Sequence, residues 1–115
     1  MTFALLVNSS PYGSEGPFNA LRLAKALELE GEHIELLFMG DGVNTARRGQ
    51  EPRTAHASLE PMLAELIEAG AGITLCGTCC ETRGLHEADI VDGAVVGTIH
   101  DFARHMKVSD KVVSF

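Results

Sequence analysis

The sequence predicts an α/β fold, a compact three-layer sandwich in which a mostly parallel sheet carries helices on both faces. Three observations lead to this prediction. Short apolar runs, each about as long as a strand, recur along the 115 residues. Amphipathic helical patterns separate them, and this alternation is typical of βαβ units. The runs are nearly continuous in hydrophobicity, which is typical of parallel strands covered on both faces.

Composition limits the size of the protein and its partners. The chain is 45% hydrophobic and 22% charged, so we expect residues 1–115 to form one domain with a real hydrophobic core. A formal net charge of −7 argues against binding nucleic acid or an anionic membrane, because either would need a basic surface.

No signal peptide or membrane-spanning run is evident. We therefore expect a cytoplasmic protein whose cysteines stay reduced.

The first part of the chain predicts a strand, a loop and a helix. Phe3–Val7 is an apolar run, and Asn8–Gly16 after it is rich in turn-forming residues. Pro17 suits the first turn of a helix that runs to about Glu30, and Gly31 ends that helix. This order is the first βα unit of the predicted sheet.

The middle of the chain predicts two more strands and the clearest helix. His33–Met39 is an apolar strand, and a short helix is predicted over Gly42–Arg47. Ser58 begins a helix whose apolar residues recur at i, i+3, i+4, i+7 and i+8, and Gly70 ends it. Gly72–Leu75 is the third strand.

The last part of the chain completes the sheet. Thr98 begins another amphipathic helix, and Lys111–Phe115 is a final strand. In such sheets the chemistry collects at the carboxyl ends of the strands, near the point where the strand order reverses. Three segments are expected there: Asn8–Gly16, Gly40–Thr45 and the cysteine segment that follows the third strand.

All three cysteines lie in that third segment, as Cys76-Gly-Thr-Cys79-Cys80. Cys76 ends the strand, and a short helical segment is expected directly after it. Unpaired backbone N–H groups and the positive end of a helix dipole favour a thiolate, which is the nucleophilic form. Gly77 lets the chain turn and leaves the sulfur approachable. We therefore predict a lowered pKa for Cys76 and a reactive thiol.

A zinc site is the first alternative for the cysteines. Structural zinc normally takes four ligands, typically in two separated pairs. The Cys76 and Cys79 pair has no second pair, and His56, His86 and His100 show no ligand spacing. We expect no metal and no cofactor.

A dithiol redox site is a stronger alternative, because Cys76 and Cys79 have the Cys-x-x-Cys spacing. In thioredoxin-like folds that motif follows the first strand of a βαβ unit, whereas here it follows the third. Cys79 remains a candidate resolving partner for Cys76. For Cys80 we expect packing near the core.

Arg83 is the one fixed cation of the segment, seven positions after Cys76. Its guanidinium either returns to the Cys76 sulfur, or forms a surface pair with Glu81 or Glu87, or caps a helix end. The residue types alone leave these roles open.

Four ordered blocks of the sequence resemble the DsrE/DsrF-like sulfur-relay family. The blocks are FALLVNSSPYGSEGPFNALRLAKAL, LFMGDGVNTA, CGTCCETRGL and DKVVSF. They are similar to the family's first strand, Tyr-Gly loop and first helix, to its second strand and following loop, to its Cys-x-x-x-x-x-x-Arg-Gly segment, and to its terminal strand. The resemblance implies a compact α/β sandwich over nearly the whole chain.

The resemblance also implies a function, that of an intracellular sulfur-relay protein without a cofactor. In the family, the cysteine at the position of Cys76 accepts sulfane sulfur from a donor as a persulfide and passes it to a thiol of a partner protein. Some members have a cysteine at the position of Cys79 and others lack it. Members assemble as trimers or hexamers, either homomeric or with paralogous subunits.

Two other classes of function remain open beside a sulfurtransferase or sulfur carrier. One is a non-catalytic oligomeric module with the same fold, and the other is a dithiol redox protein using Cys76 and Cys79. The two remaining loops supply candidates for a pocket wall, each of which also has an ordinary turn or cap role. These candidates are Tyr12, Gly13, Asp41 and Asn44.

Overall fold

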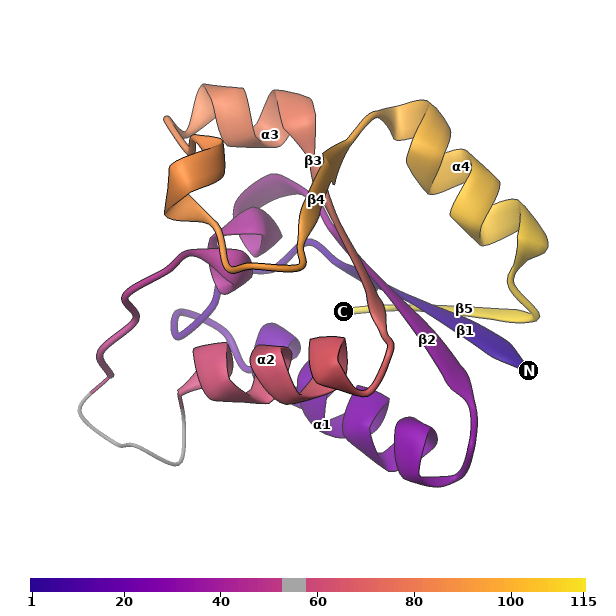
Figure 1. Ribbon diagram of the computed structural model, residues 1–115. Coiled ribbons are helices and arrows are strands. Elements are labelled where there is room, and N and C mark those ends of the chain that lie inside the picture. The colour runs from indigo at the N-terminus through magenta and orange to yellow at the C-terminus, as the bar shows by residue number, and fades with distance from the viewer. Residues whose placement is uncertain (53–57) are drawn as a thin grey trace.

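A computed structural model describes residues 1–52 and 58–115, and its core is a single five-stranded sheet (Figure 1). The strands are β1 (Thr2–Val7), β2 (His33–Phe38), β3 (Gly72–Cys76), β4 (Val95–Gly97) and β5 (Lys111–Ser114). Their order is β4-β3-β2-β1-β5, and neighbouring strands pair in parallel. The predicted α/β class is confirmed. His56, one of the histidines weighed for zinc, lies outside the described residues.

Helices cover both faces of the sheet. Helices α1 (Gly16–Leu29) and α2 (Leu59–Glu68) lie together on one face, and α4 (Ile99–Val108) lies on the other (Figure 1). The strands from β1 to β4 step in one direction across the sheet, and the last connection returns past them to β5. Because βα crossovers are right-handed, reversing the direction moves the connecting helix to the opposite face.

Three short helical segments complete the chain: the 3-10 segment η1 (Gly40–Ala46) after β2, the helix α3 (Gly77–Thr82) after β3, and the 3-10 turn η3 (Glu87–Asp89). The first two begin at the carboxyl ends of neighbouring strands, so they share one edge of the sheet. In the described part of the chain, no helix combines the length and the hydrophobicity needed to span a membrane.

The core is formed mainly by the three central strands and by the helices on one face. Burying each large aliphatic side chain contributes roughly 1.5–3 kcal/mol to folding. The fully buried strand residues include Leu5, Val7, Leu36, Leu37, Phe38 and Leu75. Helices α1 and α2 add three buried apolar side chains each, besides the buried Pro17 of α1, whereas α4 buries Phe102 alone. Apolar packing against the sheet is therefore more extensive on the face covered by α1 and α2.

Most predicted elements are found close to their predicted bounds, and β4 is the strand that the sequence did not predict. It has three residues, its two valines are exposed, and it lies at the edge of the sheet beside β3. A strand of that length shows neither an apolar run nor an alternating pattern. The helix predicted over Gly42–Arg47 is a 3-10 segment that begins two residues earlier and ends one earlier.

A close backbone approach holds η1 against the end of β1. A Cβ atom on Gly42 would lie 2.2 Å from the carbonyl oxygen of Val7, so a glycine is needed there. The N–H of Met39 donates a hydrogen bond to the same carbonyl, at 3.0 Å. This contact positions η1 beside the cysteine segment.

We expect Gly42→Ala to lower the free energy of unfolding by about 1–3 kcal/mol, because the added methyl group must displace η1 from β1. Gly13→Ala is the matched control, since its added Cβ would meet no atom closer than 3.6 Å. That control should change stability by less than about 0.5 kcal/mol. Urea unfolding followed by circular dichroism measures both. Equal losses in the two variants would contradict this account of η1.

Candidate functional site

The cysteine segment begins where β3 ends. Cys76 is the last residue of β3, opposite Gly97 of β4, and it is also the N-cap of α3. Gly77 packs closely against β4, because a Cβ on Gly77 would lie 3.2 Å from both the Gly97 carbonyl oxygen and the Val96 side chain. Cys76 is only 8% exposed. Its sulfur is therefore a nearly buried group at the carboxyl edge of the sheet, where chemistry was predicted.

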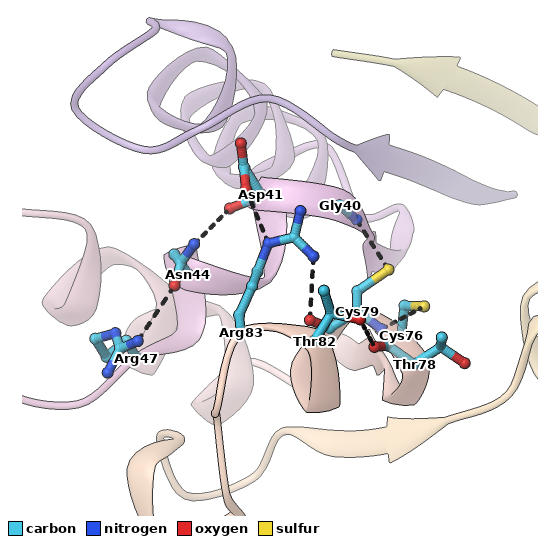
Figure 2. Close-up of polar contacts among 9 residues, drawn as sticks. All are labelled: Gly40, Asp41, Asn44, Arg47, Cys76, Thr78, Cys79, Thr82 and Arg83. Atoms are coloured by element: carbon cyan, nitrogen blue, oxygen red, sulfur yellow. Dashed lines mark hydrogen bonds and ion pairs between the residues drawn. The ribbon is translucent and has the colours of Figure 1, made fainter.

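The sulfur atoms of Cys76 and Cys79 each accept a backbone N–H (Figure 2). The N–H of Cys79 donates to Cys76 Sγ at 3.4 Å, which caps α3. The N–H of Gly40 in η1 donates to Cys79 Sγ at 3.1 Å. All three cysteines are free thiols, and Cys79 is half-buried. The Cys79 thiol is thus held between α3 and η1, and the Cys76 thiol lies at the start of α3.

Burial raises the pKa of the Cys76 thiol, because a thiolate loses its hydration there. The neighbouring Cys79 side chain raises this pKa further, whereas the backbone N–H groups of Cys79 and Thr78 lower it. Helix α3 has six residues, so its dipole is short. The prediction of a lowered pKa for Cys76 is wrong, since burial outweighs the two N–H groups. At neutral pH the free protein carries a protonated thiol.

Cys80 is part of the core, as predicted. It is 3% exposed, and burial raises the pKa of its thiol. Its carbonyl oxygen accepts the N–H of Leu85 at 2.9 Å, which closes the end of α3. Cys80 therefore differs from Cys76 and Cys79 in that its sulfur makes no hydrogen bond among the described residues.

Arg83 joins α3 to η1. Its Nε donates to Asp41 Oδ1 at 2.8 Å, and its Nη1 donates to the carbonyl oxygen of Cys79 at 3.1 Å (Figure 2). The predicted role in capping a helix end is observed. The carboxylate partner is Asp41 rather than Glu81 or Glu87, and Arg83 forms no hydrogen bond with the Cys76 sulfur in the described structure.

The other candidate wall residues hold loops together. Asn44 donates from its side-chain amide to the carbonyl oxygen of Asp41 at 3.2 Å, which is a local turn contact. The hydroxyl of Tyr12 donates to Gln50 Oε1 at 2.5 Å and accepts the N–H of Leu59 at 3.2 Å. None of these side chains forms a hydrogen bond with a cysteine in the described residues.

Gly40 donates a backbone N–H to the site, a role that the sequence did not indicate. It follows β2, and its φ of +55° lies in the left-handed region that favours glycine. This conformation belongs to the turn in which its N–H meets Cys79 Sγ. A glycine directly after the predicted strand His33–Met39 is the signal that could have indicated such a backbone donor.

The chemistry available at this site is that of two adjacent thiols. Residues 1–52 and 58–115 contain no group of three or more His, Cys, Asp or Glu side chains arranged to hold a metal ion. A thiolate can attack a sulfur–sulfur bond, and a second thiol nearby can attack the product. The geometry therefore suits sulfur transfer or dithiol exchange.

Comparison with known proteins gives a match along the whole chain. The model of the DsrE/DsrF-like family matches residues 1–115. An uncharacterized protein of Methanocaldococcus jannaschii is 39% identical over 115 residues, covering 100% of both chains. Protein YchN of Escherichia coli is 35% identical over 113 residues, covering 96% of both.

The same resemblance is seen in three dimensions. The crystal structure of YchN from Escherichia coli superposes with a TM-score of 0.93 at 34% identity, covering 100% of this chain and 99% of that one. A more distant relative is the sulfurtransferase TusD of Cronobacter sakazakii, 27% identical over 128 residues and covering 100% of both chains.

We expect alkylation of Cys76 to follow a pH profile whose midpoint lies above the ordinary thiol value of about 8.5, because burial raises its pKa. A Cys79→Ser, Cys80→Ser double variant leaves Cys76 as the one cysteine available for alkylation. Burial, the largest cause of the raised pKa of Cys76, is still present in this variant. The rate with iodoacetamide should rise as the thiol loses its proton. A midpoint below the ordinary value would contradict the dominance of burial.

Proposed function

The chain belongs to the DsrE/DsrF-like family, and on that premise we propose that it is a sulfur-relay protein acting through Cys76. In this proposal Cys76 accepts sulfane sulfur as a persulfide and passes it to the thiol of a partner protein. The observation that carries it is the position of the Cys76 sulfur, nearly buried at the carboxyl end of β3 with a backbone N–H aimed at it. The sulfurtransferase name of TusD supports the same class of chemistry.

The transfer needs no cofactor. The Cys76 thiolate attacks the outer sulfur of a donor persulfide, the donor's sulfur–sulfur bond breaks, and the donor leaves as a thiolate that takes up a proton. An acceptor thiolate then attacks the outer sulfur of the Cys76 persulfide and restores the Cys76 thiolate. The N–H groups of Cys79 and Thr78 stabilise that thiolate as it leaves. Because burial keeps the resting thiol protonated, loading should become faster as the pH rises.

Arg83 takes a positioning role in this proposal. Its guanidinium holds the Cys79 carbonyl on one side and Asp41 on the other, so it fixes α3 relative to η1. The Asp41 carboxylate is well exposed, so its Coulombic contribution is small and the geometry matters more. Residues 1–115 act as one domain of the family, and a reducing cytoplasm suits free thiols.

The partners of the chain include further copies of itself. Most of the exposed large apolar side chains in the described residues lie near the carboxyl terminus, in or directly beside β4, α4 and β5: Val95, Val96, Ile99, Met106, Val108, Val112 and Val113. Strands β4 and β5 form the two opposite edges of the sheet, and α4 packs on the face between them. Exposed apolar side chains on these three elements provide a surface for association. We propose a homo-oligomer, a trimer or hexamer, or an assembly with paralogous subunits, built on this surface.

A sulfur-loading experiment tests the relay function. Reduced protein is incubated with a low-molecular-mass persulfide and its intact mass is measured, in a Cys79→Ser background that leaves one candidate thiol of the adjacent pair. We expect a gain of one sulfur atom that a thiol acceptor removes. Adding Cys76→Ser should abolish the gain, whereas adding Cys80→Ser should leave it unchanged. No gain with several donors would support the non-catalytic module instead.

A sedimentation experiment tests the interface. We expect the wild-type chain to sediment as an oligomer and Ile99→Glu to shift it toward the monomer, because Ile99 is 60% exposed in α4. Leu29→Lys is the control, since Leu29 is 73% exposed but lies in α1. Ile99→Glu places a negative charge at the N-terminal end of α4, and Leu29→Lys places a positive charge at the C-terminal end of α1. Both charges interact favourably with the helix dipole, so neither substitution should unfold the protein. A monomeric wild type, or equal effects of the two substitutions, would count against this surface.

A further inference from the structure

We propose that Cys79 is a resolving thiol that converts a persulfide on Cys76 into a Cys76–Cys79 disulfide and releases sulfide. The chain would then also act as a dithiol-dependent reductase of sulfane sulfur. This inference rests on the proposed persulfide at Cys76, and it assigns a second, competing outcome to the same site.

The closeness of Cys79 to the Cys76 sulfur carries the inference. Cys79 lies three positions after Cys76, its N–H donates a hydrogen bond to Cys76 Sγ at 3.4 Å, and its side chain is near enough to raise the pKa of Cys76. Both side chains lie at the start of α3 and come from one tight turn (Figure 2). Bond formation between the sulfurs therefore needs side-chain rotation rather than a rearrangement of the sheet.

The two thiols are held differently, and this difference separates their roles. Cys76 is 8% exposed, so its sulfur is shielded. Cys79 is half-buried, and the N–H of Gly40 holds its sulfur between α3 and η1 at 3.1 Å. Arg83 fixes the Cys79 carbonyl as well, which limits movement of the backbone at Cys79. The resolving thiol is thus anchored next to the sulfur that it attacks.

The reaction balances without an external oxidant. The Cys79 thiolate attacks Cys76 Sγ, the inner sulfur of the persulfide, and forms the Cys76–Cys79 bond. The bond from Cys76 Sγ to the outer sulfur breaks, and the outer sulfur leaves with the electron pair as hydrosulfide. The proton that is released when the Cys79 thiol becomes a thiolate balances the negative charge of the hydrosulfide. The outer sulfur gains two electrons and the two cysteines lose two.

A dithiol reductant completes the cycle. One of its thiolates attacks the Cys76–Cys79 disulfide, and its second thiol releases the mixed disulfide, so both cysteines return to the reduced state. An acceptor protein competes with Cys79 by attacking the outer sulfur instead of the inner one. Cys79 therefore limits how long the persulfide survives when no acceptor is bound.

A single-turnover experiment without reductant tests the inference. Reduced wild-type chain, Cys79→Ser and Cys80→Ser are each loaded with glutathione persulfide, desalted, and followed by sulfide release and intact mass. The wild type should release about one sulfide per chain and become two hydrogen atoms lighter than the reduced protein. Peptide mapping should locate the new bond between Cys76 and Cys79. Cys80→Ser should behave like the wild type.

The Cys79→Ser chain separates the two proposals. We expect it to keep the extra sulfur and to release sulfide at least about tenfold more slowly, because no second thiol reaches the inner sulfur. If the wild type keeps its extra sulfur as long as Cys79→Ser does, the resolving role is wrong and the relay function stands. If Cys79→Ser gains no sulfur at all, the relay function itself fails, and the inference loses its premise.

Discussion

The parallel pairing of β1, β2 and β3 is the constraint on which the site depends. Because these strands point the same way, their carboxyl ends meet at one edge of the sheet, and the segments that follow must begin side by side there. Gly42 allows η1 to approach β1, and Cys76 begins α3 directly at the end of β3. The hydrogen bond from Gly40 to Cys79 and the ion pair of Arg83 with Asp41 then join η1 to α3. Residues about 40 positions apart in sequence thus form one cluster around two thiols.

Burial and the backbone N–H groups act in opposite directions on the pKa of Cys76. The nearly buried position of Cys76 raises its pKa, while two backbone N–H groups partly offset this effect. A protonated, shielded thiol is a slow nucleophile at neutral pH, and it is also less open to oxidation, which follows thiolate character and exposure. In the proposed relay, this combination makes loading faster as the pH rises, and the adjacent, less buried Cys79 would provide the second route for the sulfur.

Much of the fold could be predicted from the sequence, because the central strands are apolar runs and the helices have one apolar face. The strand β4 could not, since Val95 and Val96 are exposed at an edge and the strand is too short to show a pattern. The place of the cysteines was predicted from strand order, but the direction of the Cys76 pKa shift was not. That shift depends on how deeply the sulfur is buried, which packing decides. The pairing of Arg83 with Asp41 was missed because the two are far apart along the chain.

The central claim is that Cys76 holds sulfur that can be transferred. The most direct test loads the Cys79→Ser chain with a persulfide whose outer sulfur is radiolabelled, removes the excess, and locates the label before and after treatment with cyanide. Cyanide attacks the outer sulfur of a persulfide and releases it as thiocyanate. The account predicts label on the peptide at Cys76, complete release as labelled thiocyanate, and no label when Cys76 is also serine. Label at Cys80 instead, or label that cyanide does not remove, would contradict it.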